Sequence, residues 1–266
     1  MGAFTLEPRG PFTLPSAARF IAGWPPGQGD VDDDHVHLRF LVDDWSGPAH
    51  VVLRQENGVV HGSVAADNEQ RAIAQAARVL SLDHDGTGYA DVGERDAVVG
   101  ELQRSSGYLR PVLFHSPYEA AAWSIISART RHAQAVRIRD ALSRDGIFPA
   151  PERLLSLRAQ LSLPEGKLER LHAIAEAALE GRLDRERLLA APPEQALAEL
   201  QELPGIGPFY ASLILLRAVG TTDVLATGEP RLKKAVEQRY GKPLEEVADG
   251  WRPFRTWVSV LIRAHG

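Results

Sequence analysis

The sequence contains no cysteine among its 266 residues. The chain can therefore form no disulfide, no thiolate zinc site and no cysteine-held iron–sulfur cluster. No apolar run approaches the length of a membrane-spanning helix, and the opening MGAFTLEPRG lacks the basic and apolar regions of a signal peptide. We therefore expect a cytoplasmic protein that has no membrane partner and binds no structural or catalytic metal.

Positive charge is scarce in the first part of the chain. Residues 1–100 contain 7 Lys+Arg and 15 Asp+Glu, whereas residues 101–266 contain 23 and 20, and the whole chain has a net charge of −5. This balance argues against a broadly basic surface for nucleic acid. The slight basic excess after residue 100 permits local phosphate contacts, although simple solubility explains the same pattern.

The first part of the chain has the pattern of a β-sheet with one helix. Alternating apolar and polar residues predict strands over 35–43, 49–57 and 59–65, and Asn57-Gly58 predicts a two-residue hairpin between the last two. Residues 4–14 are expected to add a strand, and 68–82 has helical spacing. The Gly/Asp-rich stretch 83–96 predicts a connector that contains the domain boundary.

The rest of the chain predicts helices only. Ser116-Pro117-Tyr118-Glu119 has the pattern of a capping box at a helix start. Proline, glycine or N-cap residues bound further helices at about 132–144, 151–158, 165–181, 192–203, 208–219, 230–240 and 252–264. The sequence thus predicts an α+β chain, with a small antiparallel sheet domain over residues 1–95 and an all-α bundle over 96–266.

A glycine-rich turn, LPGIGPF at residues 203–209, lies between two of these helices. Gly205 can adopt the positive φ that reverses the chain, and Ile206 can anchor the turn in the core. Gly207 and Pro208 suit the start of the second helix. Because neither glycine shields the backbone, its N–H groups can bind an anion such as a phosphodiester. An ordinary turn between two helices fits the same residues.

Four segments resemble the helix-hairpin-helix superfamily of base-excision DNA glycosylases. LQELPGIGPFYASLILLRA resembles its hairpin, and TTDVLATGEPRLKKAVEQRYG resembles the segment that carries its catalytic carboxylate. HSPYEAAAWSIISAR and WRPFRTWVSVLIRAHG resemble the first and last helices of its bundle. The likeness is greatest to the bacterial 3-methyladenine DNA glycosylase II group and extends over nearly the whole chain. It implies DNA as the partner and removal of a damaged base as the activity.

The resemblance places the family's catalytic aspartate at Glu229, directly before Pro230. A fixed carboxylate there stabilises the positive charge that develops on the sugar as the base departs. The longer arm of glutamate shifts the carboxylate by roughly 1 Å, which can slow the reaction. An acidic residue at a helix start also fits a purely stabilising role. Asp223, six residues earlier, is a poor substitute.

The resemblance also identifies positions that would contact the flipped base or fill the space that it leaves in the DNA. Lyase-type relatives carry a Schiff-base lysine where this chain has Phe209, so the resemblance implies base removal without strand cleavage. The family usually has Gln and an apolar wedge where this chain has Ala128 and Arg129. Arg129 can fill the gap left by a flipped nucleotide, or it can be a solvated charge. The aromatic residues in the segments that line the family's base pocket are Phe209, Trp123, Tyr118, Tyr210 and Trp257, and each also fits a core position.

The sequence thus favours a monofunctional DNA glycosylase that flips 3-methyladenine-type purines out of double-stranded DNA and excises them. A cationic alkylated base is already a good leaving group, so it is the expected substrate. We expect a monomer without a cofactor, apart from a monovalent cation that hairpin carbonyls bind in relatives. Two alternatives stay open: a protein that binds DNA without excising bases, and a protein-interaction module built on the acidic first part.

Overall fold

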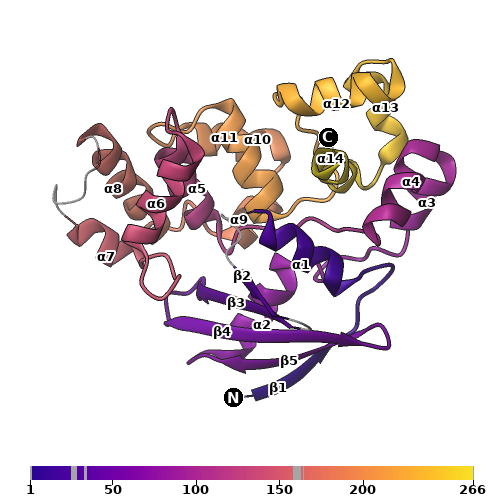
Figure 1. Cartoon of the computed structure of the whole chain (residues 1–266). Helices are drawn as coiled ribbons and strands as arrows, with labels where there is room; N and C mark the ends of the chain where they lie inside the picture. Colours follow the sequence, from indigo (N-terminus) through magenta and orange to yellow (C-terminus); the bar gives the residue numbers. More distant parts are fainter. Residues whose placement is uncertain (1, 25–28, 33–34, 158–162, 164, 266) are drawn as a thin grey trace.

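The computed structural model of the protein describes residues 2–24, 29–32, 35–157, 163 and 165–265. A sheet at one end of the molecule lies beneath a larger assembly of helices (Figure 1). This arrangement is the α+β fold that the sequence predicts. No helix among the described residues combines the length and the apolar character needed to cross a bilayer.

The sheet has five antiparallel strands in the order β1-β5-β4-β3-β2. Their bounds are β1 Gly2–Leu6, β2 Gly29–Val31, β3 Val36–Leu41, β4 Pro48–Glu56 and β5 Val59–Ala65. The predicted hairpin at Asn57-Gly58 is confirmed, and both residues have the positive φ that a tight two-residue turn requires (50° and 84°). Helix α2 (Glu69–Val79) packs against β4 and β5, so one face of the sheet is covered.

The predicted strand over residues 4–14 is wrong beyond Leu6. Gly10 turns the chain with a φ of +81°, and helix α1 (Leu14–Ala22) then begins with Pro15 in its first turn. Side chains of α1 and α2 share one hydrophobic cluster with the sheet. Helix α1 lies between the sheet and the helices above it in Figure 1, and this position brings its C-terminal end to the functional site.

The stretch expected to be a connector forms helix α3 (Tyr89–Arg95), followed directly by α4 (Ala97–Ser106). Gly93 in α3 has a packing role, because a Cβ on this residue would lie 2.7 Å from the Cα of Gly100 in α4. The absence of a side chain therefore lets the two helices approach closely. Both helices share a hydrophobic cluster with the C-terminal helices rather than with the sheet. The exact domain limits stay a prediction.

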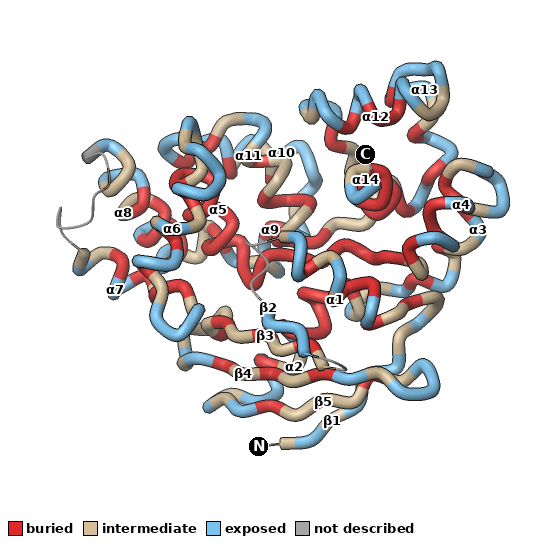
Figure 2. The backbone as a smooth tube through the Cα atoms, in the orientation of Figure 1, coloured by how far each residue is buried: buried red, intermediate tan, exposed pale blue. Residues whose placement is uncertain are grey.

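The remaining helices form two groups, and buried residues run through both (Figure 2). Their bounds are α5 Pro117–Ser127, α6 His132–Leu142, α7 Pro151–Ser156, α8 Glu165–Leu179, α9 Arg185–Ala190, α10 Pro193–Gln201, α11 Pro208–Ile214, α12 Pro230–Tyr240, α13 Leu244–Val247 and α14 Arg255–Ala264. A π-helical turn, Leu215–Val219, continues α11. Helices α5 to α11 surround one core, and α12 to α14 surround the other together with α3 and α4.

Candidate active site

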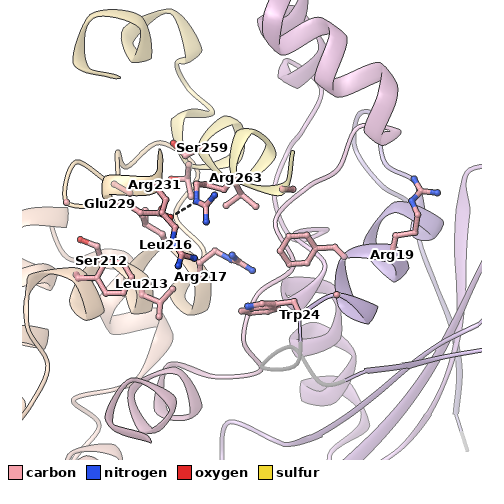
Figure 3. Close-up of a pocket in the computed structure, with 18 residues that line it drawn as sticks. Arg19, Trp24, Ser212, Leu213, Leu216, Arg217, Glu229, Arg231, Ser259 and Arg263 are labelled. Atoms are coloured by element: carbon pink, nitrogen blue, oxygen red, sulfur yellow. Dashed lines mark hydrogen bonds and ion pairs between the residues drawn. The ribbon is translucent and has the colours of Figure 1, made fainter. Parts of the chain in front are cut away.

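A cavity of about 570 Å³ lies where α1, α11 and its π-helical turn, the start of α12 and α14 meet (Figure 3). Its volume is within the range of small-ligand sites, about 300–1,000 Å³. The described residues that line it are Arg19, Phe20, Gly23, Trp24, Phe209, Ser212, Leu213, Leu216, Arg217, Ala226, Gly228, Glu229, Arg231, Thr256, Ser259, Val260, Arg263 and Ala264. The cavity is therefore built jointly by the first and the last parts of the chain.

Glu229 lies in the wall of this cavity, at the N-cap of α12. Its side chain makes no cap hydrogen bond; instead Arg263, in the last turn of α14, donates from Nε to Glu229 Oε1 at 2.6 Å. About a quarter of each side chain is exposed, 26% and 27%. The carboxylate therefore faces the cavity as one half of an ion pair (Figure 3).

A second arginine, Arg217, also lines the cavity. Its guanidinium carbon lies 4.2 Å from the ring centre of Trp24 and 5.1 Å from that of Phe20. Nη2 donates to the Val112 carbonyl at 2.7 Å, whereas the buried Nε has no acceptor among the described residues. Burial lowers the pKa of Arg217 to about 10, and the nearby charge of Glu229 opposes this shift. The guanidinium thus stays charged at neutral pH.

The hairpin between α10 and α11 has the conformation expected from its residues. Gly205 has a φ of +89°, the buried Ile206 donates its N–H to the Leu203 carbonyl at 3.0 Å, and Gly207 is the N-cap of α11. The backbone N–H groups of Gly205 and Gly207 have no acceptor among the described residues. The exposed Arg170 packs its side chain against Gly205. Two free donors and a cation thus lie together beside the cavity's Phe209.

The structure separates the five aromatic residues proposed for the base pocket. Phe209 lines the cavity and is 47% exposed, and Tyr210 packs edge-on against it with ring centres 5.2 Å apart. Trp123, Tyr118 and Trp257 do not line the cavity but are buried in the hydrophobic clusters.

The structure thus places these three residues in the core, and their part in a base pocket stays a prediction. Tyr118 donates its hydroxyl to the Pro149 carbonyl at 3.0 Å, and Trp257 packs against the ring of Tyr89 and the guanidinium of Arg110. Trp123 meets His132 edge-on. Large aromatic side chains in amphipathic helices fill cores more often than they line sites, and the sequence pattern did not distinguish the two roles.

Arg129 is exposed just after α5, in a turn that its φ of 53° closes. Lys167, on α8, holds this turn from beneath: its Nζ donates to the carbonyls of Ile126 and Ala128 and to the Thr130 hydroxyl at 2.6–2.8 Å. Burial, with a smaller contribution from the charge of Arg170, lowers the pKa of Lys167. These hydrogen bonds hold the backbone of the turn that carries the exposed Arg129.

Asp223 lies outside the cavity lining. Its carboxylate accepts from Arg255 Nε and from Arg252 Nη1, both at 2.9 Å, and so anchors the start of α14. This structural role agrees with the expectation that Asp223 is a poor substitute for Glu229 as the catalytic carboxylate. Among the described residues no cluster of His, Asp and Glu could hold a metal ion. A monovalent cation at the hairpin stays a prediction.

Sequence reasoning missed Trp24, Arg217 and Arg263, which lie in the cavity wall. Trp24 follows helix α1, and the sequence did not predict that helix. Nothing in the residues around Trp24 indicated its contact with Arg217. Arg263 lies in the last turn of α14 and resembles an ordinary basic residue at a helix C-terminus. Only the fold brings these residues to Glu229.

Comparisons with known proteins agree with this architecture. No protein-family model matches the chain. It is 32% identical over 119 residues to DNA-3-methyladenine glycosylase 2 of Escherichia coli, a match covering 43% of this chain and 42% of that protein. It is 25% identical over 200 residues to DNA-3-methyladenine glycosylase of Bacillus subtilis, covering 68% of this chain and 66% of that protein. Each match thus covers less than two thirds of the length of the relative.

A solved 3-methyladenine DNA glycosylase from Archaeoglobus fulgidus superposes with a TM-score of 0.78 at 20% identity, covering 98% of this chain and 97% of that one. The chain therefore shares the fold of that solved protein. By sequence, the chain is similar over parts of its length to the two 3-methyladenine glycosylases named above. The resemblance noted from its motifs is thus confirmed.

Proposed function

We propose that the chain is a monofunctional DNA N-glycosylase that removes alkylated purines from double-stranded DNA. The observation that carries this proposal is the position of Glu229, whose carboxylate lies in the wall of a cavity of about 570 Å³ next to the hairpin. The two relatives named above are 3-methyladenine DNA glycosylases, and this agrees with the proposed substrate class.

The hairpin supplies the grip on DNA in this proposal. A phosphate can accept from the free N–H groups of Gly205 and Gly207, and Arg170 adds a charge beside them. Gripping one strand there brings the neighbouring nucleotide to the cavity mouth, where Phe209 offers an exposed ring on which a flipped base can stack. Arg129 is proposed to contact the space that this nucleotide leaves.

Glu229 is proposed to stabilise the sugar as the base departs. The C1′–N bond breaks with its electron pair on the base, which leaves positive charge on the deoxyribose. A carboxylate held in the cavity wall opposes that charge, and a water molecule then adds to C1′. None of the described residues that line the cavity is a lysine. We therefore propose that the product is an abasic site in an intact strand.

A base-release assay tests this proposal. Purified protein is incubated with duplexes that carry one alkylated purine each, covering cationic and neutral lesions. Free base is measured, and strand nicking is scored before and after alkali. We expect base release with nicking only after alkali, and no protein–DNA adduct on borohydride treatment. Retained duplex binding without release of any base would instead support a protein that only binds DNA.

A further inference from the structure

The cavity carries an excess of positive charge. Its charged lining residues, among those described, are Arg19, Arg217, Arg231, Arg263 and Glu229, so four cations and one anion contribute to its wall. A site of this sign attracts electron-rich groups and opposes a cationic ligand. This balance disagrees with the cationic base expected from the sequence.

The single carboxylate is already compensated. Arg263 donates to Glu229 at 2.6 Å, and Arg217 lies close enough for the charge of Glu229 to influence it. A cationic base that enters the cavity therefore finds no isolated anion. The carboxylate that it meets is already paired with the Arg263 guanidinium (Figure 3).

Two aromatic rings at this site already contact a cation of the protein. Cationic bases bind through the negative face of an aromatic ring. The Arg217 guanidinium already lies over Trp24 at 4.2 Å and over Phe20 at 5.1 Å, so the protein's own cation occupies these rings. Phe209 remains for stacking, which needs no charge on the base.

We propose that this cavity selects a neutral alkylated base that departs as an anion, and that Arg263 is the residue that sets this preference. The inference rests on the proposed function and refines its substrate. When a neutral base leaves, the electron pair of the C1′–N bond gives the base a negative charge. Water then supplies its oxygen to C1′ and its proton to the base.

A guanidinium beside the departing base stabilises this developing negative charge. A cationic base becomes neutral as it leaves, so the same guanidinium repels it before the bond breaks and offers it nothing afterwards. Arg263 can perform this task because it lies in the cavity wall, and its Nε alone is engaged with Glu229. Its terminal nitrogens have no hydrogen-bond partner among the described residues.

Single-turnover release from two duplexes tests the proposal, one with 1,N6-ethenoadenine, which is neutral, and one with 7-methylguanine at about pH 6, where it is cationic. We expect Arg263→Gln to lower ethenoadenine release at least about tenfold more than it lowers 7-methylguanine release. Arg263→Lys, which keeps the charge, should retain more ethenoadenine release than Arg263→Gln. Arg54→Gln is the control, because Arg54 forms an exposed ion pair on β4.

The outcomes separate this proposal from the function on which it rests. A parallel loss with both bases would show that Arg263 only positions Glu229, and it would overturn the selectivity. Release of 7-methylguanine alone by the wild-type protein would also overturn it, while the glycosylase function would stand. Release of neither base would contradict the glycosylase function itself. Circular dichroism melting verifies that each variant is folded.

Discussion

Arg263 Nε and Glu229 Oε1 lie 2.6 Å apart across the wall of the cavity, although 34 residues separate them in the chain. The first belongs to the last turn of α14 and the second begins α12. Their pairing fixes the longer arm of the glutamate, which would otherwise have several rotamers. The departure from aspartate at this position is therefore matched by a partner that holds the carboxylate in place.

The aromatic residues of the site and of the core should respond differently to truncation. Phe209→Ala should lower base release by about 10- to 100-fold, because base–aromatic stacking contributes about 1–3 kcal/mol. The melting temperature should change little, since Phe209 is exposed. Trp257→Ala should instead lower the free energy of unfolding by about 3–5 kcal/mol, because Trp257 is buried. Release kinetics and urea denaturation of both variants check this contrast, and equal loss of stability would refute it.

The two glycines of the hairpin should also differ. Gly205→Ala should destabilise the fold by about 1–2 kcal/mol, because its φ is +89° and a Cβ would lie 2.9 Å from Ile125 and Arg170. Gly207→Ala should be tolerated, because its φ is −89° and no atom lies within 4 Å of an added Cβ. The new methyl group would nevertheless shield the backbone from a phosphate. We expect weaker duplex binding at unchanged stability, measured by fluorescence anisotropy and thermal melting.

The buried Glu119 on α5 should make the free energy of unfolding depend on pH in the acidic range. Burial opposes its charge, but the Arg139 and His115 partners outweigh burial and lower its pKa to about 2 from 4.5. A shift of this size corresponds to roughly 3 kcal/mol. Because the folded-state pKa is the lower one, this stability is present above about pH 4.5 and is lost as the pH falls through about 2.

Glu119→Gln tests this dependence. At pH 7 the variant should lose about 3–5 kcal/mol of unfolding free energy, because Arg139 is left buried without its anion. The difference from the wild-type protein should shrink as the pH falls from about 4.5 towards 2. Urea denaturation at several pH values measures it, and a difference independent of pH would contradict the account.

Lys167 should matter for DNA binding through the turn that it supports. Lys167→Met removes three donated bonds beneath Arg129 and leaves two carbonyls without that partner. We expect about 1 kcal/mol less stability and a several-fold weaker duplex affinity, since Arg129 is no longer held in one position. Lys242→Met, at an exposed position after α12, is the control for charge alone. Equal effects of the two substitutions on affinity would show that the turn plays no part.

Local signals predicted much of the fold. Alternation and the Asn57-Gly58 turn predicted the central strands, and Ser116 caps α5 as expected, accepting from the Glu119 N–H at 3.1 Å. The Glu119 side chain does not return to Ser116 as a capping box requires, because Arg139 and His115 bind it. The role of that side chain depends on its contact with Arg139 of helix α6, and no local pattern shows that contact.

The same limit explains the outcome at the candidate site. The resemblance to a known family pointed to Glu229 and Phe209, and the structure brings both to one cavity. It could not show that Trp257 and Trp123 face the core, since both fit an amphipathic helix in either orientation. Arg263 and Trp24 meet the cavity only through tertiary packing between distant parts of the chain.

The central claim is that the Glu229 carboxylate lowers the barrier to base loss. Glu229→Gln keeps the size of the side chain and removes its charge, so the single-turnover release rate at saturating protein tests the claim most directly. We predict a loss of at least about 100-fold, the size typical of a lost electrostatic contact to the transition state, with duplex affinity unchanged within about threefold. A release rate within about threefold of the wild-type value would contradict the account.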